Sequence, residues 1–128
     1  MAVTRKQGSF SWNELLTRDV EASKAFYTQL FGWTAEASPG GEYTIFKVGD
    51  EQIAGMSQLP GQAEQAGSPS HWGAYVTVDN LDDIVEKAQA LGATVLRPPT
   101  EISVGRFCLI QDPQGAIISF VEYTEKQG

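Results

Sequence analysis

The pattern of apolar and polar residues predicts two similar strand and helix segments in succession. Residues 10–18 and 71–78 are rich in apolar residues and are typical of strands, the second also in β-branched residues. Each is followed by apolar residues at the spacing of one buried helix face. In the first helix, the expected buried residues are Ala22, Ala25, Phe26 and Leu30. In the second, they are Leu81, Ile84, Val85, Ala88 and Leu91.

Three further strands are expected after each helix. They cover about 34–37, 43–48 and 52–59 in the first half, and about 94–97, 106–111 and 116–123 in the second. Turn-forming residues separate several of these strands. The clearest are Gly40-Gly41, Gly49-Asp50 and Asp112-Pro113-Gln114-Gly115. Both halves are therefore expected to have the order β-α-β-β-β.

An internal repeat supports this division. Six residues recur sixty positions later in one register without gaps. The pairs are Trp12 and Trp72, Thr17 and Thr77, Asp19 and Asp79, Gln29 and Gln89, Gly32 and Gly92, and Thr34 and Thr94. Asp19, and either Asp79 or Asn80, stand where a helix N-cap is needed, and the two glycines follow the helices, where a left-handed residue favours glycine.

The predicted fold is α+β, with two tandem β-α-β-β-β modules in one domain over residues 1–128. We expect module 1 at about 8–59, a linker at 60–70, and module 2 at about 71–124. The linker is rich in Gly, Pro, Gln and Ala. Neither module can bury both faces of its small sheet alone, so the modules should form a curved mixed sheet around a concave cleft, with the helices outside.

Charge and cysteine content narrow the choice of partners and compartment. The 128 residues carry a net charge of −7, which disfavours nucleic acid and anionic membrane surfaces and favours a neutral or cationic ligand. No apolar stretch is long enough to span a bilayer. The single cysteine, Cys108, lies in an apolar run and has no partner for an internal disulfide. We expect a cytoplasmic protein.

Two motifs resemble those of a known family. Residues 25–33, AFYTQLFGW, close the first helix, and residues 112–115, DPQG, precede the last strand. In this two-module context the chain resembles the glyoxalase / bleomycin-resistance / dioxygenase (vicinal oxygen chelate) superfamily from about Trp12 to Tyr123. The resemblance implies the paired-module fold and a homodimer. It does not fix the function, because the family includes isomerases, epimerases, dioxygenases and antibiotic-binding proteins.

The resemblance also implies where a metal would be held. The corresponding positions are Trp12 or Asn13, Met56, Gly73 and Ser119. None of these residues is a good ligand for a hard divalent cation. We therefore expect no metal and no other cofactor at the family position. If a metal binds elsewhere, the candidate ligands are Glu14, His71 and Glu122.

The expected ligand-binding residues line the cleft of the implied fold. They are Asn13, Leu15, Met56, Tyr75 and Ser119. Glu14 is the candidate catalytic residue: a carboxylate in an apolar strand is either a ligand anchor or general base in the cleft, or a solvated side chain at an edge. His71, beside the linker, is interpreted as a surface residue.

These observations favour a metal-independent small-molecule-binding protein that forms a homodimer. The alternative is a metal-dependent lyase, isomerase or dioxygenase with shifted ligands, and a third possibility is a structural subunit without a ligand. The sequence leaves open whether the protein is an enzyme.

Overall fold

The computed structural model describes residues 6–38, 43–61, 65, 67–102 and 104–124. These residues divide into two compact units. Unit 1 lies within residues 12–73, and unit 2 combines residues 6–11 with residues 74–124. The predicted Gly40-Gly41 turn lies outside the described residues, as do positions 62–64 and 66 of the expected linker.

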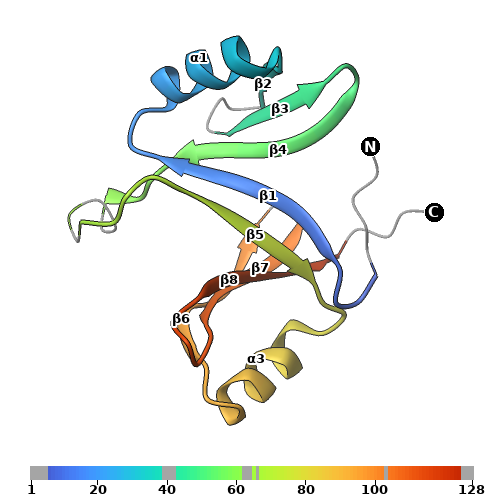
Figure 1. Ribbon diagram of the computed structural model, residues 1–128. Helices are drawn as coiled ribbons and strands as arrows, with labels where there is room; N and C mark the ends of the chain where they lie inside the picture. The colour runs from blue at the N-terminus through green and yellow to red at the C-terminus, as the bar shows by residue number, and fades with distance from the viewer. Residues whose placement is uncertain (1–5, 39–42, 62–64, 66, 103, 125–128) are drawn as a thin grey trace. The chain divides into compact units, whose positions relative to one another are not determined.

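Unit 1 contains one helix and a four-stranded mixed sheet. Its elements are β1 (Phe10–Thr17), α1 (Val20–Phe31), β2 (Thr34–Ala37), β3 (Thr44–Val48) and β4 (Glu51–Gln58). The first two residues of β1 belong to unit 2. The strand order is β2-β3-β4-β1, antiparallel except for the parallel pair of β4 and β1. Helix α1 packs on this sheet through contacts to β2 and β4 (Figure 1).

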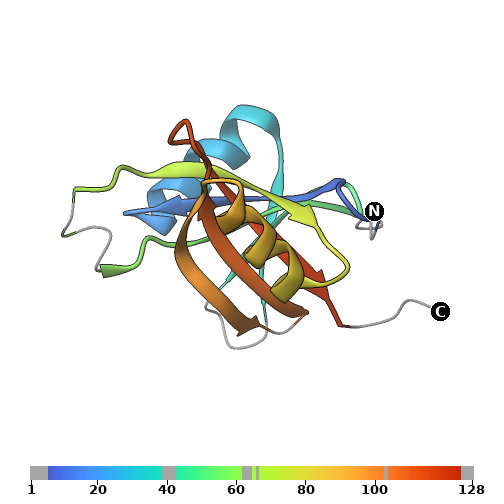
Figure 2. The same ribbon diagram turned by 90° about the horizontal axis from the view of Figure 1, so that it is seen from below.

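Unit 2 has the same order of elements. They are β5 (His71–Thr77), α3 (Leu81–Ala90), β6 (Thr94–Ile102), β7 (Gly105–Gln111) and β8 (Ile117–Tyr123), with the first three residues of β5 assigned to unit 1. The strand order is β5-β8-β7-β6, with β5 and β8 parallel. Helix α3 contacts β6, β7 and β8 and crosses them on one side (Figure 2). The predicted α+β class with two β-α-β-β-β modules is confirmed.

Strands β1 and β5 are each divided between the two units, because the first residues of each strand belong to the other unit. Within unit 2, the backbone N–H of Gly8 donates to the carbonyl of Thr77 at 2.8 Å. The backbone N–H of Thr77 in turn donates to the carbonyl of Ser9 at 2.8 Å. Residues 6–11 therefore belong to unit 2, although the sequence interpretation placed residues 8–11 in module 1.

The helix ends follow the repeat with one shift. Asp19 caps α1, accepting a hydrogen bond from the backbone N–H of Ala22 at 3.0 Å. In α3 the cap is Asn80, which accepts from the N–H of Asp83 at 3.1 Å, so this helix starts one residue later than the offset of sixty predicts. Gly32 and Gly92 both have positive φ, at 75° and 100°, as predicted.

Each unit has its own apolar core between its helix and its sheet. In unit 1 the buried members are Leu15, Phe46, Ala54 and Met56. In unit 2 they are Val78, Leu81, Cys108 and Ile110. Among the described residues, no helix has the length and apolar character needed to cross a membrane.

The buried face of α1 differs from the prediction. Phe26 and Leu30 are 57% and 56% exposed, and Val20 and Tyr27 pack on the core in their place. The Tyr27 ring contacts Trp33 and Phe46 at centroid distances of 5.8 and 6.2 Å. The prediction gave weight to aliphatic spacing and overlooked this ring, whose contacts turn Phe26 and Leu30 outward.

Gly105 gives a test of the pairing of β7 with β8 in unit 2. Its φ is 152°, and a Cβ on it would overlap the backbone carbonyl of Glu122 in the neighbouring strand. Because backbone cannot swing aside as a side chain can, Gly105→Ala should lower the free energy of unfolding by about 2–4 kcal/mol. Urea denaturation followed by circular dichroism measures this change.

The matched control is Gly61→Ala, because a Cβ at Gly61 meets no atom within 4 Å. We expect the control to stay within about 0.5 kcal/mol of the parent protein. Equal stability of the two variants would contradict the described pairing of β7 with β8.

Candidate functional site

Each sheet has one face covered by its helix and one face turned away from it. Successive side chains of a strand point to opposite faces, so the core residues identify the covered face. In unit 1, Leu15 and Met56 are register partners in the core. Their neighbours Glu14 and Gly55, also register partners, therefore lie on the face turned away from α1.

An aromatic pair occupies part of this open face in unit 1. Trp12 Nε1 donates a hydrogen bond to the hydroxyl oxygen of Tyr43 at 2.9 Å. A Cβ at Gly55 would overlap the Tyr43 phenol, so glycine leaves the space that this ring fills. The sequence interpretation named Trp12 in the internal repeat and as a possible metal position, and it placed Tyr43 in an expected strand but not among the site residues. The strand alternation could have placed Trp12 and Glu14 on one face.

Glu14 lies on the same face and is half-buried. Ser57 Oγ donates to Glu14 Oε2 at 3.4 Å, from the neighbouring strand β4. The carboxylate thus has a defined position on the sheet rather than a freely solvated one at the edge. A partly buried carboxylate with a hydroxyl partner can anchor a ligand or accept a proton.

Three of the expected ligand-binding residues lie on the covered side of unit 1. Leu15 is 4% exposed and Met56 is fully buried, and both pack in the core with Phe46. Asn13 shares their strand parity and is exposed. The sequence interpretation had these residues one position out of register, and a slip of one residue exchanges the faces of a strand. The corresponding open-face positions are Glu14, Gly55 and Ser57.

In unit 2, by contrast, the structure brings the two expected residues together. Tyr75 of β5 and Ser119 of β8 are register partners on the face turned away from α3. The Tyr75 ring lies 6.1 Å from that of Phe107, between centroids. The Arg97 guanidinium carbon lies 5.7 Å from the Phe107 centroid. Aromatic rings, a hydroxyl and a cation therefore share one sheet face.

His71 and the other fallback metal ligands do not form a cluster. His71 is exposed, and its Nδ1 lies 2.9 Å from the carbonyl oxygen of Pro69. Glu14 and His71 belong to unit 1, whereas Glu122 belongs to unit 2. Within the described part of the chain, no group of three His, Cys, Asp or Glu side chains is placed to hold a metal ion.

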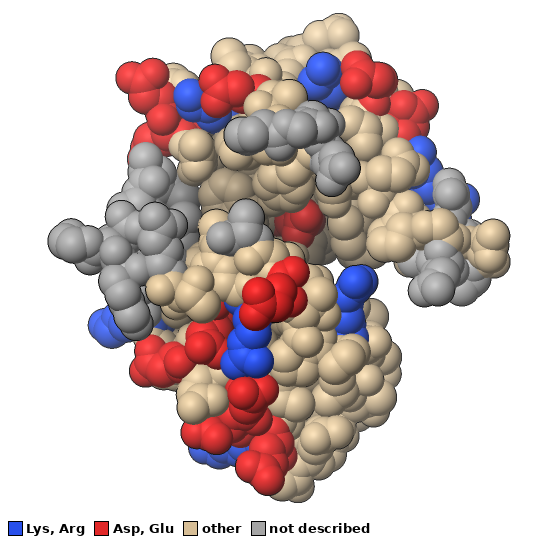
Figure 3. All heavy atoms as spheres, turned by 180° about the vertical axis from the view of Figure 1, so that it is seen from behind, with Lys and Arg blue, Asp and Glu red and all other residues tan. Residues whose placement is uncertain are grey.

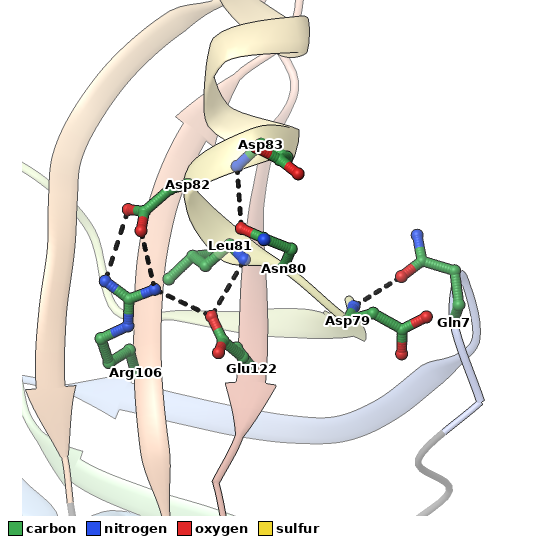
Figure 4. Close-up of polar contacts among 8 residues, drawn as sticks. All are labelled: Gln7, Asp79, Asn80, Leu81, Asp82, Asp83, Arg106 and Glu122. Carbon is green, nitrogen blue, oxygen red and sulfur yellow. Dashed lines mark hydrogen bonds and ion pairs between the residues drawn. The ribbon is translucent and has the colours of Figure 1, made fainter.

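Glu122 instead forms a hydrogen bond and an ion pair with other residues of unit 2. Its Oε1 accepts a hydrogen bond from the backbone N–H of Leu81 at 2.9 Å, at the start of α3. Arg106 Nη2 donates to the same oxygen at 2.9 Å and pairs with Asp82 at 3.2 Å (Figure 4). The hydrogen bond from Leu81 and the Arg106 guanidinium together hold the pKa of Glu122 below its usual value.

On the visible side of unit 2, acidic and basic side chains adjoin a broad area with few charges (Figure 3).

The metal positions implied by the resemblance are Trp12 or Asn13, Met56, Gly73 and Ser119. The register places Asn13 and Met56 on the covered side of unit 1, and the other residues do not suit a hard divalent cation. Met56 is a soft, fully buried thioether and Gly73 has no side chain. Ser119 offers only a neutral hydroxyl, and Trp12 donates its indole N–H to Tyr43. The set therefore includes no carboxylate or imidazole, which supply most protein ligands of such metals.

Comparison with known proteins gives one consistent family. The sequence profile described as "Glyoxalase/Bleomycin resistance protein/Dioxygenase superfamily" matches residues 9–120. "Putative glyoxylase CFP32" of Mycobacterium tuberculosis is 37% identical over 98% of this chain and 48% of its own length. "Anthracycline biosynthesis protein DnrV" of Streptomyces peucetius is 33% identical over 85% of this chain and 45% of its own. The chain thus spans about half the length of these relatives.

A solved structure shows the same fold. The Mn(II)-bound glyoxalase from Novosphingobium aromaticivorans superposes with a TM-score of 0.62 and 14% identity. The match covers 96% of this chain and 43% of the other. At this identity the likeness concerns the fold alone.

The lowered pKa of Glu122 predicts a pH-dependent contribution to stability. A carboxylate with a depressed folded-state pKa stabilises the fold above the unfolded-state pKa, about 4.3. That contribution is lost as the pH falls through the folded-state pKa. Glu122→Gln keeps an oxygen for the Leu81 N–H but removes the charge. The parent protein should therefore be more stable than the variant at pH 7, with the difference shrinking below about pH 4.3.

Urea denaturation between pH 3 and pH 7 measures the difference. Glu86→Gln is the control, because it removes one negative charge from an exposed position of α3. A stability difference for Glu122→Gln that is the same at pH 3 and pH 7 would show that the charge contributes nothing.

Proposed function

This chain belongs to the Glyoxalase/Bleomycin resistance protein/Dioxygenase superfamily, and from that premise we propose that it binds a small molecule on the open face of unit 2 without a metal. The observation that carries the proposal is the pairing of Tyr75 and Ser119 beside the Phe107 ring. Apolar surface with a few convergent polar groups is characteristic of small-molecule sites.

The name of one relative supports an aromatic ligand. The Streptomyces peucetius relative takes part in anthracycline biosynthesis, by its name. Anthracyclines are planar and aromatic, and an open face with Tyr75 and Phe107 offers rings against which such a molecule can stack. Binding of this kind needs no metal, so the unsuitable residues at the metal positions are no obstacle to it.

A second candidate function rests on Glu14. Its carboxylate is half-buried on the open face of unit 1 and has Ser57 as a hydrogen-bond partner. A glyoxalase-like lyase or isomerase, or a dioxygenase, would use such a carboxylate as general base or shifted ligand. Metal analysis of the purified protein discriminates the two functions, because only the second one requires a metal.

We also propose that the chain forms a homodimer through α1. Phe26, Leu30 and Phe31 are 57%, 56% and 58% exposed on this helix, more than ordinary packing leaves for three such neighbours. Ala22, Phe26, Gln29 and Leu30 line a shallow hollow on the same surface. A contiguous apolar patch of this kind is typical of protein interaction sites, and a two-fold contact would pair the patch with itself.

We further propose that the protein is cytoplasmic. Cys108, the one cysteine of the sequence, is buried in the core of unit 2. Burial raises the pKa of its thiol to about 11, which leaves it protonated and unreactive at neutral pH. A fold that uses no disulfide suits a reducing compartment.

Ligand binding predicts a response to planar aromatic probes. With 2-naphthol as the probe at a hundred times its dissociation constant, the fold should gain about 2.7 kcal/mol of stability. Tyr75→Ala should weaken binding about tenfold or more, because it removes the ring surface of the site. Thermal shift and intrinsic fluorescence titration, each with and without EDTA, measure both effects.

Leu91→Ala is the control for this experiment, because Leu91 is an exposed apolar residue of unit 2 at the end of α3. Binding that is abolished by EDTA would favour the enzyme instead. Binding that Leu91→Ala and Tyr75→Ala change equally would place the ligand elsewhere.

If the dimer forms through α1, a charge introduced on this helix should separate the subunits. Leu30→Lys should raise the dimer dissociation constant about a hundredfold or more, because a buried lysine without a partner is costly at an interface. Leu91→Lys, which places the same charge on α3, should leave the dimer intact. Analytical ultracentrifugation at micromolar concentration measures both, and a 13.9 kDa monomer for the parent protein would overturn the proposal.

A further inference from the structure

The open face of unit 2 carries a row of paired residues that crosses all four strands. Arg97 of β6 pairs with Leu109 of β7, Leu109 with Ser119 of β8, and Ser119 with Tyr75 of β5. Register partners in neighbouring strands share a face, and the strands lie about 4.8 Å apart, so the row extends over roughly 14 Å. One end of this row is the exposed guanidinium of Arg97, and the other end is the half-buried Tyr75 phenol beside the buried Ser119.

The backbone around Arg97 is irregular on both sides. The pairing of β6 with β7 shifts register between Val95 and Arg97 and again between Arg97 and Thr100. Pro98 and Pro99 follow directly and have no N–H to donate to the ladder. Such bulges change the direction of a side chain and occur often beside functional sites. The two shifts isolate Arg97 as a single paired residue between irregular segments.

The surroundings of Arg97 differ from those of Arg106, the other arginine in this sheet. Arg106, on the face covered by α3, is held by both Asp82 and Glu122. Within the described ranges, Arg97 has no carboxylate at ion-pair distance, and its guanidinium lies over the Phe107 ring. A guanidinium beside an aromatic ring keeps its planar N–H donors available for a pair of ligand oxygens.

We propose that Arg97 makes the open face of unit 2 selective for a planar aromatic ligand that carries an acidic oxygen group, such as a carboxylate or an acidic phenol. The acidic group binds the Arg97 guanidinium, and the ring system lies across Leu109 against Tyr75 and Phe107. This inference rests on the proposed binding function and adds the charge of the ligand.

This selectivity departs from the expectation set by the net charge. The chain carries −7 overall, which favours neutral or cationic ligands at long range. Exposed charges are largely screened beyond about 10 Å at 0.1 M ionic strength, so a contact with Arg97 depends on the local cation rather than on the total. The local arrangement therefore determines the preference of the bound state.

The test compares three probes of the same shape and different charge. They are naphthalene-2-carboxylate, its neutral amide, and the cationic 2-naphthylmethylammonium ion. The parent protein should bind the carboxylate at least tenfold more tightly than the amide, and the cation most weakly. Arg97→Gln should bring the carboxylate to the affinity of the amide, while Arg97→Lys should keep part of the preference, since lysine retains the charge without the planar donors.

Lys87→Gln is the matched control, because it removes one positive charge from α3 of the same unit. It should leave the ratio between carboxylate and amide unchanged. Circular dichroism and melting temperature confirm that the exposed Arg97 position tolerates both variants. Isothermal titration calorimetry at two ionic strengths measures the affinities.

The outcomes separate this inference from the function on which it rests. If the probes bind and Tyr75→Ala weakens all of them, but Arg97→Gln leaves the ratio unchanged, the role of Arg97 is wrong and the binding function stands. If no probe binds, or if Tyr75→Ala has no effect on any of them, both proposals are overturned.

Discussion

The pleat of the two sheets is the constraint on which the rest of this structure depends. A strand has only two faces, and the single helix of each unit covers one of them. Every strand residue is thereby assigned either to the core, as Met56 and Cys108 are, or to the opposite face, as Glu14 and Tyr75 are. A functional side chain on these strands must share the parity of the open face, whatever its chemistry.

The same constraint explains how far the sequence predicts the fold. The repeat and the turn residues identified the order of elements and the left-handed glycines, because these depend on local chemistry. The covered side of α1 did not follow from the spacing of apolar residues, because the Tyr27 ring packs on Phe46, a residue of β3 that lies beyond the helix in the sequence. Of the two expected caps of α3, Asp79 and Asn80, the structure uses Asn80; the two residue types have similar capping ability, so the sequence alone did not decide between them.

The predicted strand parity agrees with the structure in one unit and not in the other, for a physical reason. Tyr75 and Ser119 share a face because the predicted parity of β5 and β8 was right. In β1 and β4 the parity was displaced by one residue, so Leu15 and Met56 were expected where Glu14 and Ser57 lie. Arg97 could not have been found from spacing, because two bulges separate it from the regular alternation of β6.

Glu122 accepts a hydrogen bond at the start of α3, beside the Asn80 cap, and this contact has a consequence for folding. Its hydrogen bond to the Leu81 N–H joins residues 41 positions apart, whereas most helix caps come from adjacent residues. The first turn of α3 is therefore completed only when β8 has reached its place, the last strand of the sheet to be synthesised. A local opening of β8 releases this turn as well, so helix and strand belong to one cooperative unit and should exchange their amide hydrogens together.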